Sequence, residues 1–413
     1  MRKRGHVNRN DMILLLILFL FAFSLRFYDF SYPDFKWFDE VMHVPAATNY
    51  WNNGQFEPDD WVHPPLRHII LYGFLQFFGD NPYGWRMRNI LFGAIAAVLT
   101  YLFAFEISGS RRTALMAGLL LATDPLHIVL SRYTYEEIYG CAFFLAAVVL
   151  YLKHNQRSLW FVSSALFMGC ALATKWYYVP CWFLVLFLAL RENDNYRNVG
   201  TALFISSTYF FIPLSIFILS YYQWFGRGYS VTEFMEFIIN TYHALQNTRP
   251  SSYEPGFVFL SQTSAVEWFI RPIVIGEGTY LSTDRGEFII FLNNLPIWIL
   301  TIPSMIGLAI VAVRRRCMTL ALPALFFCAS YMLYFIVQRP VFLYSAVPLL
   351  PFAFTAIAFM IMKLSDRYGS RLFYTILAVM VSWNLFLYPL VTAKKVPIAL
   401  YSYIINNPDV KLH

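Results

Sequence analysis

The chain has 413 residues, of which 58% are hydrophobic, 19% aromatic and only 13% charged, with a net charge of +7. These proportions exclude an ordinary soluble domain and indicate an all-α polytopic membrane protein, because backbone groups in lipid must find hydrogen-bond partners within their own segment. The positive charge does not predict nucleic-acid binding, since the basic residues are scattered at the ends of apolar runs. The five cysteines show no CxxC spacing and are interpreted as small buried residues.

Eleven apolar runs of about the length that crosses a bilayer follow one another along the chain. The first follows a short basic segment without a small-residue cleavage site, so we expect a retained span and a cytoplasmic N terminus. Short segments rich in Lys and Arg then alternate with segments that are expected outside. The expected spans are 12–28, 85–107, 115–130, 138–152, 159–173, 178–190, 199–219, 288–313, 320–337, 342–362 and 373–391.

Two longer polar segments, 30–83 and 220–286, are expected on the external side of a single domain over 1–413. The first contains aromatic-rich amphipathic pieces, 46–51 and 68–78, that suit helices lying in the membrane interface. The second shows no clear helix period and is expected to be a structured loop. We predict that 30–83 is the catalytic loop.

The first chemical candidate is the acidic pair Asp39-Glu40, which follows the first span. An acidic dipeptide in an external loop is most often a solvated pair. This pair, however, lies among Trp37, Phe38 and Val41, just outside a span, where a polyprenyl-phosphate headgroup would sit. A carboxylate there could take a proton from an acceptor hydroxyl as that hydroxyl attacks an anomeric carbon.

The second candidate is His63-Pro64-Pro65, a stiff turn that starts a helix at Leu66. A histidine in such a turn is more often a hydrogen-bonded loop residue than a ligand. Since no other His or carboxylate stands at metal-ligand spacing from it, we predict no metal site and no cofactor.

A third group consists of cations at the external mouths of the spans. A charge near the membrane interior is costly and by default suggests a function, and phosphate is its natural counter-ion. The alternative is that each side chain reaches out to the interface. The predicted phosphate-binding residues are Arg86, Arg88, Arg132, Lys175, Arg271 and Arg339.

Taken together, these motifs resemble the protein O-mannosyltransferases that use dolichyl- or polyprenyl-phosphate mannose, within the GT-C membrane glycosyltransferases. The resemblance covers nearly the whole chain, and its strength comes from the order of motifs that are individually weak. The matching motifs are Asp39-Glu40, His63-Pro64-Pro65-Leu66, Arg86 with Phe92-Gly93, Leu130-Ser131-Arg132-Tyr133, Ala173-Thr174-Lys175-Trp176, Trp268 with Arg271-Pro272, 294–298, and 342–344 with 348–351.

The resemblance implies a GT-C fold of about eleven transmembrane helices, with two external loop regions that carry amphipathic helices. It implies that Asp39 is the catalytic base and that Glu40 positions the acceptor or the base. It further implies a single displacement with inversion, in which no divalent metal is obligatory. Residues expected to contact the acceptor or to organise the loops are Trp37, His63, Pro64, Pro65 and Trp268.

Departures from the family pattern concern Arg67, which follows the Pro-Pro turn, and Asn293, which precedes Asn294 where the family usually has Gly. The segment 220–286 is also too short for the β-trefoil module of the eukaryotic enzymes. These features point to a bacterial or archaeal member in a prokaryotic cell membrane. They leave the sugar open, and they leave a protein, a lipid or a glycan open as the acceptor.

The leading hypothesis is an inverting glycosyltransferase that moves a hexose, mannose by the resemblance, from a polyprenyl-phosphate donor to a protein Ser or Thr hydroxyl at the external face. A lipid- or glycan-directed transferase of the same fold, like the aminoarabinose transferases, is the close alternative. A multi-pass transporter or flippase is the rival from another class. It would place ionisable residues in mid-span and interrupted helices in matched halves, and the sequence shows no such repeat.

Overall fold

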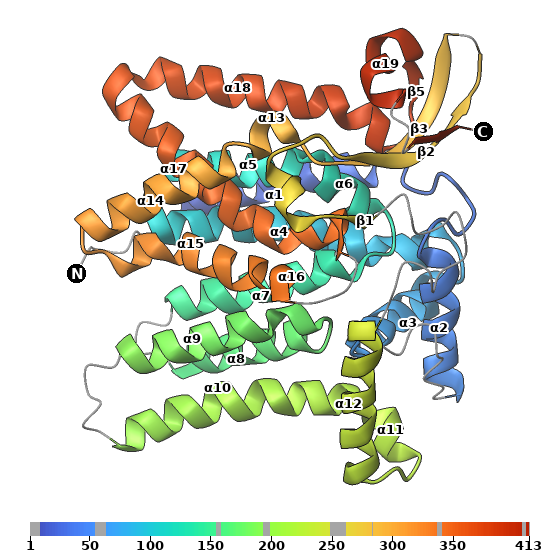
Figure 1. The fold of residues 1–413 in the computed structure, drawn as a ribbon, viewed down its shortest axis with the longest axis vertical. Helices are drawn as coiled ribbons and strands as arrows, with labels where there is room; N and C mark the ends of the chain where they lie inside the picture. The colour runs from blue at the N-terminus through green and yellow to red at the C-terminus, as the bar shows by residue number, and fades with distance from the viewer. Residues whose placement is uncertain are drawn as a thin grey trace.

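The structure, a computed structural model, describes residues 9–53, 63–153, 158–192, 199–247, 262–282, 284–336, 341–406 and 410–412. Most of these residues are helical. In Figure 1 the long helices run roughly side by side as a bundle, while shorter helices and a small sheet cover one of its ends. The expected helical membrane bundle is confirmed, and the sheet is an addition to it.

One bundle helix, α4 (Pro82–Ser108), begins and ends at residues that cap it. The side chain of Asn81 accepts hydrogen bonds from the backbone N–H groups of Tyr83 and Gly84, and the same helix ends at Gly109, whose φ is +64°. The bundle comprises α1 (Arg9–Phe27), α4 (Pro82–Ser108), α5 (Arg111–Thr123), α6 (Pro125–Arg132), α7 (Glu136–Lys153), α8 (Ser158–Leu172), α9 (Val179–Glu192), α10 (Val199–Ser220), α13 (Leu295–Trp298), α14 (Thr301–Arg314), α15 (Met318–Tyr331), α16 (Leu333–Ile336), α17 (Leu350–Tyr368) and α18 (Ser370–Leu387).

Seven helices in the described part of the chain are long and apolar enough to cross a membrane, and the bent pair α5–α6 would make an eighth. Other expected spans correspond to shorter apolar helices, such as α8 and α9. The number of eleven spans therefore stays a prediction.

The span expected over 115–130 is broken, and α5 meets α6 at an angle of 53°. Pro125 lacks a backbone N–H and disfavours helical geometry at the preceding residue, and Asp124 accordingly has a ψ of 126°. The Asp124 carboxylate then caps α6, accepting from the N–H of His127 at 3.0 Å and from the indole of Trp298 at 2.9 Å. The break is thus a capped, buried feature rather than a frayed helix.

Four helices form a layer across one end of the bundle: α2 (Glu40–Asn53), α3 (Leu66–Phe78), α11 (Tyr222–Gly226) and α12 (Val231–Asn247). The amphipathic pieces expected within 30–83 lie in α2 and α3, so their helical structure is confirmed. The segment 220–286 differs from the expectation of a loop without helix period, because α12 is a regular helix of 17 residues.

A four-stranded sheet in the order β5-β3-β2-β6 adjoins this layer, and β2 pairs antiparallel with β3 and parallel with β6. A second, two-stranded sheet joins β1 to β4. The strands are β1 (Gln262–Thr263), β2 (Val274–Tyr280), β3 (Arg285–Leu292), β4 (Val341–Phe342), β5 (Lys395–Pro397) and β6 (Val410–Leu412). Short 3-10 helices η1 (Trp176–Tyr178), η3 (Ala265–Phe269), η4 (Leu343–Leu349) and η5 (Tyr388–Val391), together with α19 (Ile398–Ile405), complete the end.

The prediction that a span begins at residue 288 is wrong, because 288–292 belongs to strand β3. A short, wholly apolar run has the same appearance as a buried strand or a buried helix, so periodicity could not separate them. The side chain of Asn293 ends the strand by accepting from the N–H of Ile273 at 2.7 Å and donating to the carbonyl of Trp268 at 2.8 Å. The helical part begins at Leu295.

The centre of the bundle lies between α4, α7 and α17. Phe352 of α17 packs edge-on against Phe103 of α4 and Phe144 of α7, with ring centroids 5.3 and 5.7 Å apart. α10, by contrast, leaves apolar side chains such as Phe211 and Leu219 exposed, as a lipid-facing helix does. The end layer therefore rests on a closely packed interior.

Candidate active site

Asp39 stands where the turn after α1 enters α2. The preceding Phe38 has a φ of +54°, and the Asp39 carbonyl accepts from the N–H of Met42 at 3.1 Å and of His43 at 2.8 Å. The side chain of Asp39 is half-buried at this junction. The first helical hydrogen bonds of α2 thus hold the backbone of the predicted base in place.

The surroundings of Asp39 make its carboxyl group a weaker acid. Removal from water is the largest cause of a pKa raised to about 7. The carboxylates of Glu136 and Glu137 also raise this pKa, while positive charge on His43 and on Lys175 acts to lower it. A carboxylate that titrates near neutrality is well matched to general-base work.

Glu40, next to Asp39, is buried and only 1% exposed. It accepts two hydrogen bonds from Arg86, from Nε at 2.9 Å and from Nη2 at 2.8 Å, and a third from the hydroxyl of Thr134 at 3.3 Å. The remaining Arg86 donors go to the main chain of the turn that precedes Asp39. They reach the carbonyls of Phe30 at 3.0 Å, Pro33 at 2.7 Å and Phe35 at 3.0 Å.

All five N–H groups of the Arg86 guanidinium therefore have an acceptor within the protein. This geometry departs from the expectation that Arg86 binds the donor phosphate, because a buried guanidinium whose donors are all used has no N–H to offer a ligand. It also encloses the Glu40 carboxylate among protein groups. Together, Glu40 and Arg86 shape the turn that presents Asp39.

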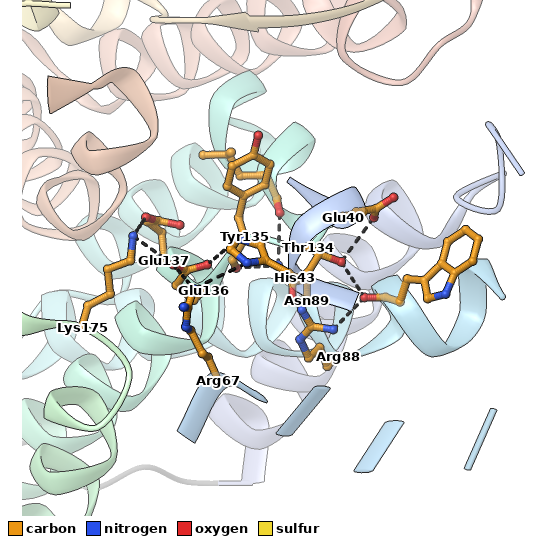
Figure 2. Close-up of polar contacts among 12 residues, drawn as sticks. Glu40, His43, Arg67, Arg88, Asn89, Thr134, Tyr135, Glu136, Glu137 and Lys175 are labelled. Carbon is orange, nitrogen blue, oxygen red and sulfur yellow. Dashed lines mark hydrogen bonds and ion pairs between the residues drawn. The ribbon is translucent and has the colours of Figure 1, made fainter. Parts of the chain in front are cut away.

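A second polar network centres on Glu136, in the first turn of α7 (Figure 2). One carboxylate oxygen lies 3.3 Å from Nη1 of Arg67 and 3.1 Å from Nζ of Lys175, and the other lies 3.4 Å from Nε2 of His43. Lys175 also donates to Glu137 at 2.5 Å. The network thereby links α2, α3, α7 and the turn that leads into η1.

Close backbone packing keeps the Lys175 turn against α7. A Cβ added at Gly140 would lie only 2.8 Å from Oγ1 of Thr174. The backbone N–H of Leu66, which follows the Pro-Pro turn, donates to the carbonyl of Ala173 at 3.2 Å. Two of the predicted motifs, separated by about a hundred residues, therefore meet at this turn.

Sequence reasoning missed three members of this network: His43, Glu136 and Glu137. It noted Arg67 only as a departure from the family pattern. One signal was available, because Glu136-Glu137 directly precedes a long apolar run, and adjacent carboxylates at such a depth are costly without a partner. That partner, Lys175, is 38 residues further along the chain.

Two other predicted phosphate ligands, Arg88 and Arg132, are fully buried among protein groups. Arg88 donates to the carbonyl of Trp85 at 2.7 Å and lies over the ring of Tyr139 at 5.7 Å. Arg132 donates to carbonyls just beyond and at the end of α1, those of Arg26 at 3.1 Å, Tyr28 at 2.7 Å and Asp29 at 2.9 Å. Both side chains bind protein groups at the junction between the spans and the layer at the end of the bundle. These contacts differ from the predicted contact with the phosphate of the sugar donor.

The last two predicted phosphate ligands lie elsewhere. Arg271 is exposed and pairs with Glu267 one helical turn away, at 2.7 Å. Arg339 lies outside the described residues. Of the predicted cations that the structure describes, Lys175 is the one that lies both in the Glu136 network and on the wall of a cavity.

The residues predicted to contact the acceptor or to organise the loops differ in their surroundings. Trp37 stacks on Phe291 of β3 with centroids 5.7 Å apart, and Trp268 is buried with its indole donating to Thr263 at 2.7 Å. Pro64 and Pro65 are buried, and Pro65 directly precedes α3. His63, in contrast, faces the cavity.

A mainly apolar cavity of about 350 Å³ opens beside Lys175. Its walls come from α12, η1, α16, β4 and η4, together with His63, so the polar segments 30–83 and 220–286 both contribute. Tyr344 also lines a second, small hollow, whose walls include Phe38, the residue before Asp39, and Tyr135. The cavity is lined by His63, Lys175, Trp176, Tyr177, Ile238, Tyr242, Leu245, Gln246, Leu333, Tyr334, Val341, Phe342, Tyr344 and Ser345.

Among the described residues, no three His, Cys, Asp or Glu side chains converge so that they could hold a metal ion. Whether the reaction needs a divalent metal is a separate matter, and the expectation that it does not stays a prediction.

A family model for dolichyl-phosphate-mannose-protein mannosyltransferase matches residues 16–225, about half of the chain. This range contains Asp39, the Glu136 network and Lys175. The chain belongs to this mannosyltransferase family.

Relatives within the mannosyltransferase family are distant in sequence. A polyprenol-phosphate-mannose–protein mannosyltransferase of Corynebacterium glutamicum is 25% identical, over 85% of this chain and 82% of that protein. A protein of the same name from Mycolicibacterium smegmatis is 24% identical, over 53% of this chain and 49% of that protein. Protein O-mannosyl-transferase 1 of Danio rerio is 30% identical, over 46% of this chain and 29% of that protein.

Solved structures show that this mannosyltransferase has the GT-C fold. The S. cerevisiae protein O-mannosyltransferase Pmt1-Pmt2 complex bound to the sugar donor matches with a TM-score of 0.81 at 12% identity, covering 99% of this chain and 93% of that one. ArnT from Cupriavidus metallidurans bound to undecaprenyl phosphate matches with a TM-score of 0.59 at 16% identity, covering 86% of this chain and 60% of that one.

Proposed function

We propose that this protein transfers mannose from a polyprenyl-phosphate carrier to the hydroxyl group of a Ser or Thr in an acceptor protein. The names of the family and of its relatives support the donor and the acceptor. One observation in this chain carries the proposal: a half-buried carboxylate, Asp39, with a pKa near 7 lies within the electrostatic reach of Lys175, which borders an apolar cavity. Base, cation and space for a lipid thus meet at one end of the bundle.

The reaction is a single displacement at the anomeric carbon. The acceptor oxygen forms a bond to C1 while the bond from C1 to the phosphate oxygen breaks on the opposite side, which inverts the anomeric configuration. Asp39 takes the hydroxyl proton as the nucleophile attacks, and polyprenyl phosphate leaves with the electrons of the broken bond. Asp39 then loses its proton to water before the next turnover.

Donor binding uses the cavity and Lys175. Apolar walls suit the first isoprene units of the carrier, and the ammonium group suits its phosphate. Lys175 has three N–H donors, two of which contact Glu136 and Glu137, so within the described residues the third is available to a phosphate oxygen. Arg67 helps to balance the charge of the two carboxylates when the phosphate arrives.

The active site faces the external side of the membrane, and the N terminus lies in the cytoplasm. The short segments rich in Lys and Arg support this orientation, because such segments stay inside. Asp11, at the start of α1, pairs with Arg111 at the start of α5, which is the end of the bundle opposite to Asp39. Base and N terminus therefore belong to opposite faces.

The test is transfer by purified protein from labelled polyprenyl-phosphate sugars to an acceptor protein. Asp39→Asn should lower the rate of transfer by a factor of about 10²–10⁴ and leave the melting temperature of the protein unchanged. Asp34→Asn, an exposed neighbour in the same turn, is the matched control and should keep full activity. Undiminished turnover by Asp39→Asn would exclude Asp39 as the base.

A panel of labelled donors and of acceptors tests the reaction itself. Transfer of aminoarabinose to a lipid, in place of transfer of mannose to protein, would overturn the proposed substrates.

A further inference from the structure

Helix α12 exposes an apolar strip along one face. Val231, Met235, Ile239 and Tyr242 are 68%, 54%, 50% and 58% exposed. Their spacing of four, four and three residues places them on one side of the helix. Exposure of such a strip to water is unfavourable, so we expect it to contact lipid or another apolar surface.

The other faces of α12 have different surroundings. Phe234 is buried between Tyr221 and Phe225, with centroids 5.1 Å from each, so the helix is fixed to the segment that follows α10. Ile238 and Leu245, adjacent to the exposed strip, line the cavity. Polar side chains occupy the remaining exposed face, namely Thr232, Glu233, Glu236, Asn240 and His243.

The orientation of α12 indicates what covers the strip. In Figure 1, α12 lies across the end of α10 and nearly perpendicular to it. Since α10 is a candidate span with exposed apolar side chains up to Leu219, its axis runs across the bilayer. A helix perpendicular to α10 at its end therefore lies parallel to the membrane surface.

We propose that α12 is an interfacial helix whose apolar strip lies in the acyl-chain region of the adjoining leaflet, so that the cavity it lines borders the lipid. Exposed aromatic side chains around it, those of Tyr222, Tyr229 and Tyr242, match the enrichment of such residues at membrane interfaces. The polar face carries Glu233 and Glu236, so apolar burial rather than attraction to anionic lipids holds the helix there. This placement does not depend on the transfer reaction.

Depth measurements on the reconstituted full chain test the placement. In a chain whose five cysteines are replaced by Ala, single nitroxide labels are attached to Met235→Cys and Ile239→Cys, with Glu236→Cys and Asn240→Cys as polar-face controls. In phosphatidylcholine–phosphatidylglycerol vesicles, labels at 235 and 239 should be more accessible to oxygen than to a water-soluble nickel chelate. Labels at 236 and 240 should show the reverse.

Preferential access of the nickel chelate at 235 and 239 would show that the strip faces water. Low access of both reagents would show that protein, such as a second copy of the chain, covers it. Either result overturns the proposal. A second measurement uses the native chain: phosphatidylcholine with a diazirine on its acyl chain should label peptides of α12 on irradiation, and their absence among the adducts would contradict the placement.

Discussion

Arg86 holds Glu40 through two parallel hydrogen bonds of 2.9 and 2.8 Å, and both side chains are buried. The pair joins α4 to the first residue of α2, and Asp39 directly precedes that residue. The position of the proposed base in space is therefore held by this buried pair.

Removing Arg86 should destabilise the protein strongly. Arg86→Ala would leave Glu40 as a buried charge without its partner, which costs about 3–5 kcal/mol. The matched control is Arg271→Ala, which removes an exposed pair with Glu267 that contributes about 0–1 kcal/mol. Thermal unfolding in detergent measures both, and equal melting temperatures would show that the Arg86 pair does not organise the fold.

The rate of transfer should fall at acid pH, because only the ionised form of Asp39 can accept a proton. With a pKa of about 7, the ionised fraction decreases as the pH falls below 7, and kcat/KM should follow it. Glu137→Gln removes a negative charge that raises this pKa, so the acid limb of the profile should move to lower pH. Asp34→Asn should leave the limb in place, and a limb near pH 4 in the unmodified protein would contradict the raised pKa.

Glu136 should matter more for stability than Glu137, although the two are adjacent. Glu136 contacts Arg67, Lys175 and His43 on three other segments, while the ion-pair contact of Glu137 is with Lys175. Glu136→Gln leaves the buried Arg67 with a weaker acceptor and should cost several kcal/mol, on the order of 3. Glu137→Gln should cost less, and the reverse order of unfolding temperatures would show that Glu136 is not the centre of the network.

Gly140→Ala should impair donor binding. The added methyl group would approach Oγ1 of Thr174 to 2.8 Å and displace the turn that carries Lys175. We expect a KM for the lipid donor raised about tenfold, which corresponds to about 1.4 kcal/mol. Gly73→Ala is the matched control, because it lies in α3 with nothing within 4 Å of the new Cβ and should be neutral or slightly stabilising.

Filling the cavity should also raise the donor KM while the pH profile stays unchanged. Leu245→Trp puts an indole into the wall contributed by α12, whereas Val266→Trp adds the same group at an exposed position outside the cavity. Donor titrations compare the two variants. An unchanged KM for Leu245→Trp would show that the lipid carrier binds elsewhere.

The sequence alone determined the class of this protein and indicated which residue, Asp39, is its proposed base. Apolar runs of span length are local signals, so the helical bundle followed from them. The order of motifs around Asp39 and Lys175 likewise indicated the family that the family model confirms.

Only the tertiary structure decided how the charges are paired and what covers the apolar runs. Arg86 meets Glu40 across 46 residues and Arg67 meets Glu136 across 69, and no local pattern states which of several cations a carboxylate will reach. The run 288–292 became a strand because β2 lies beside it, and the apolar side chains of α12 divide between core, cavity and surface according to what packs against them. A local sequence specifies which side chains must find partners, whereas their partners are chosen by the packing of distant segments.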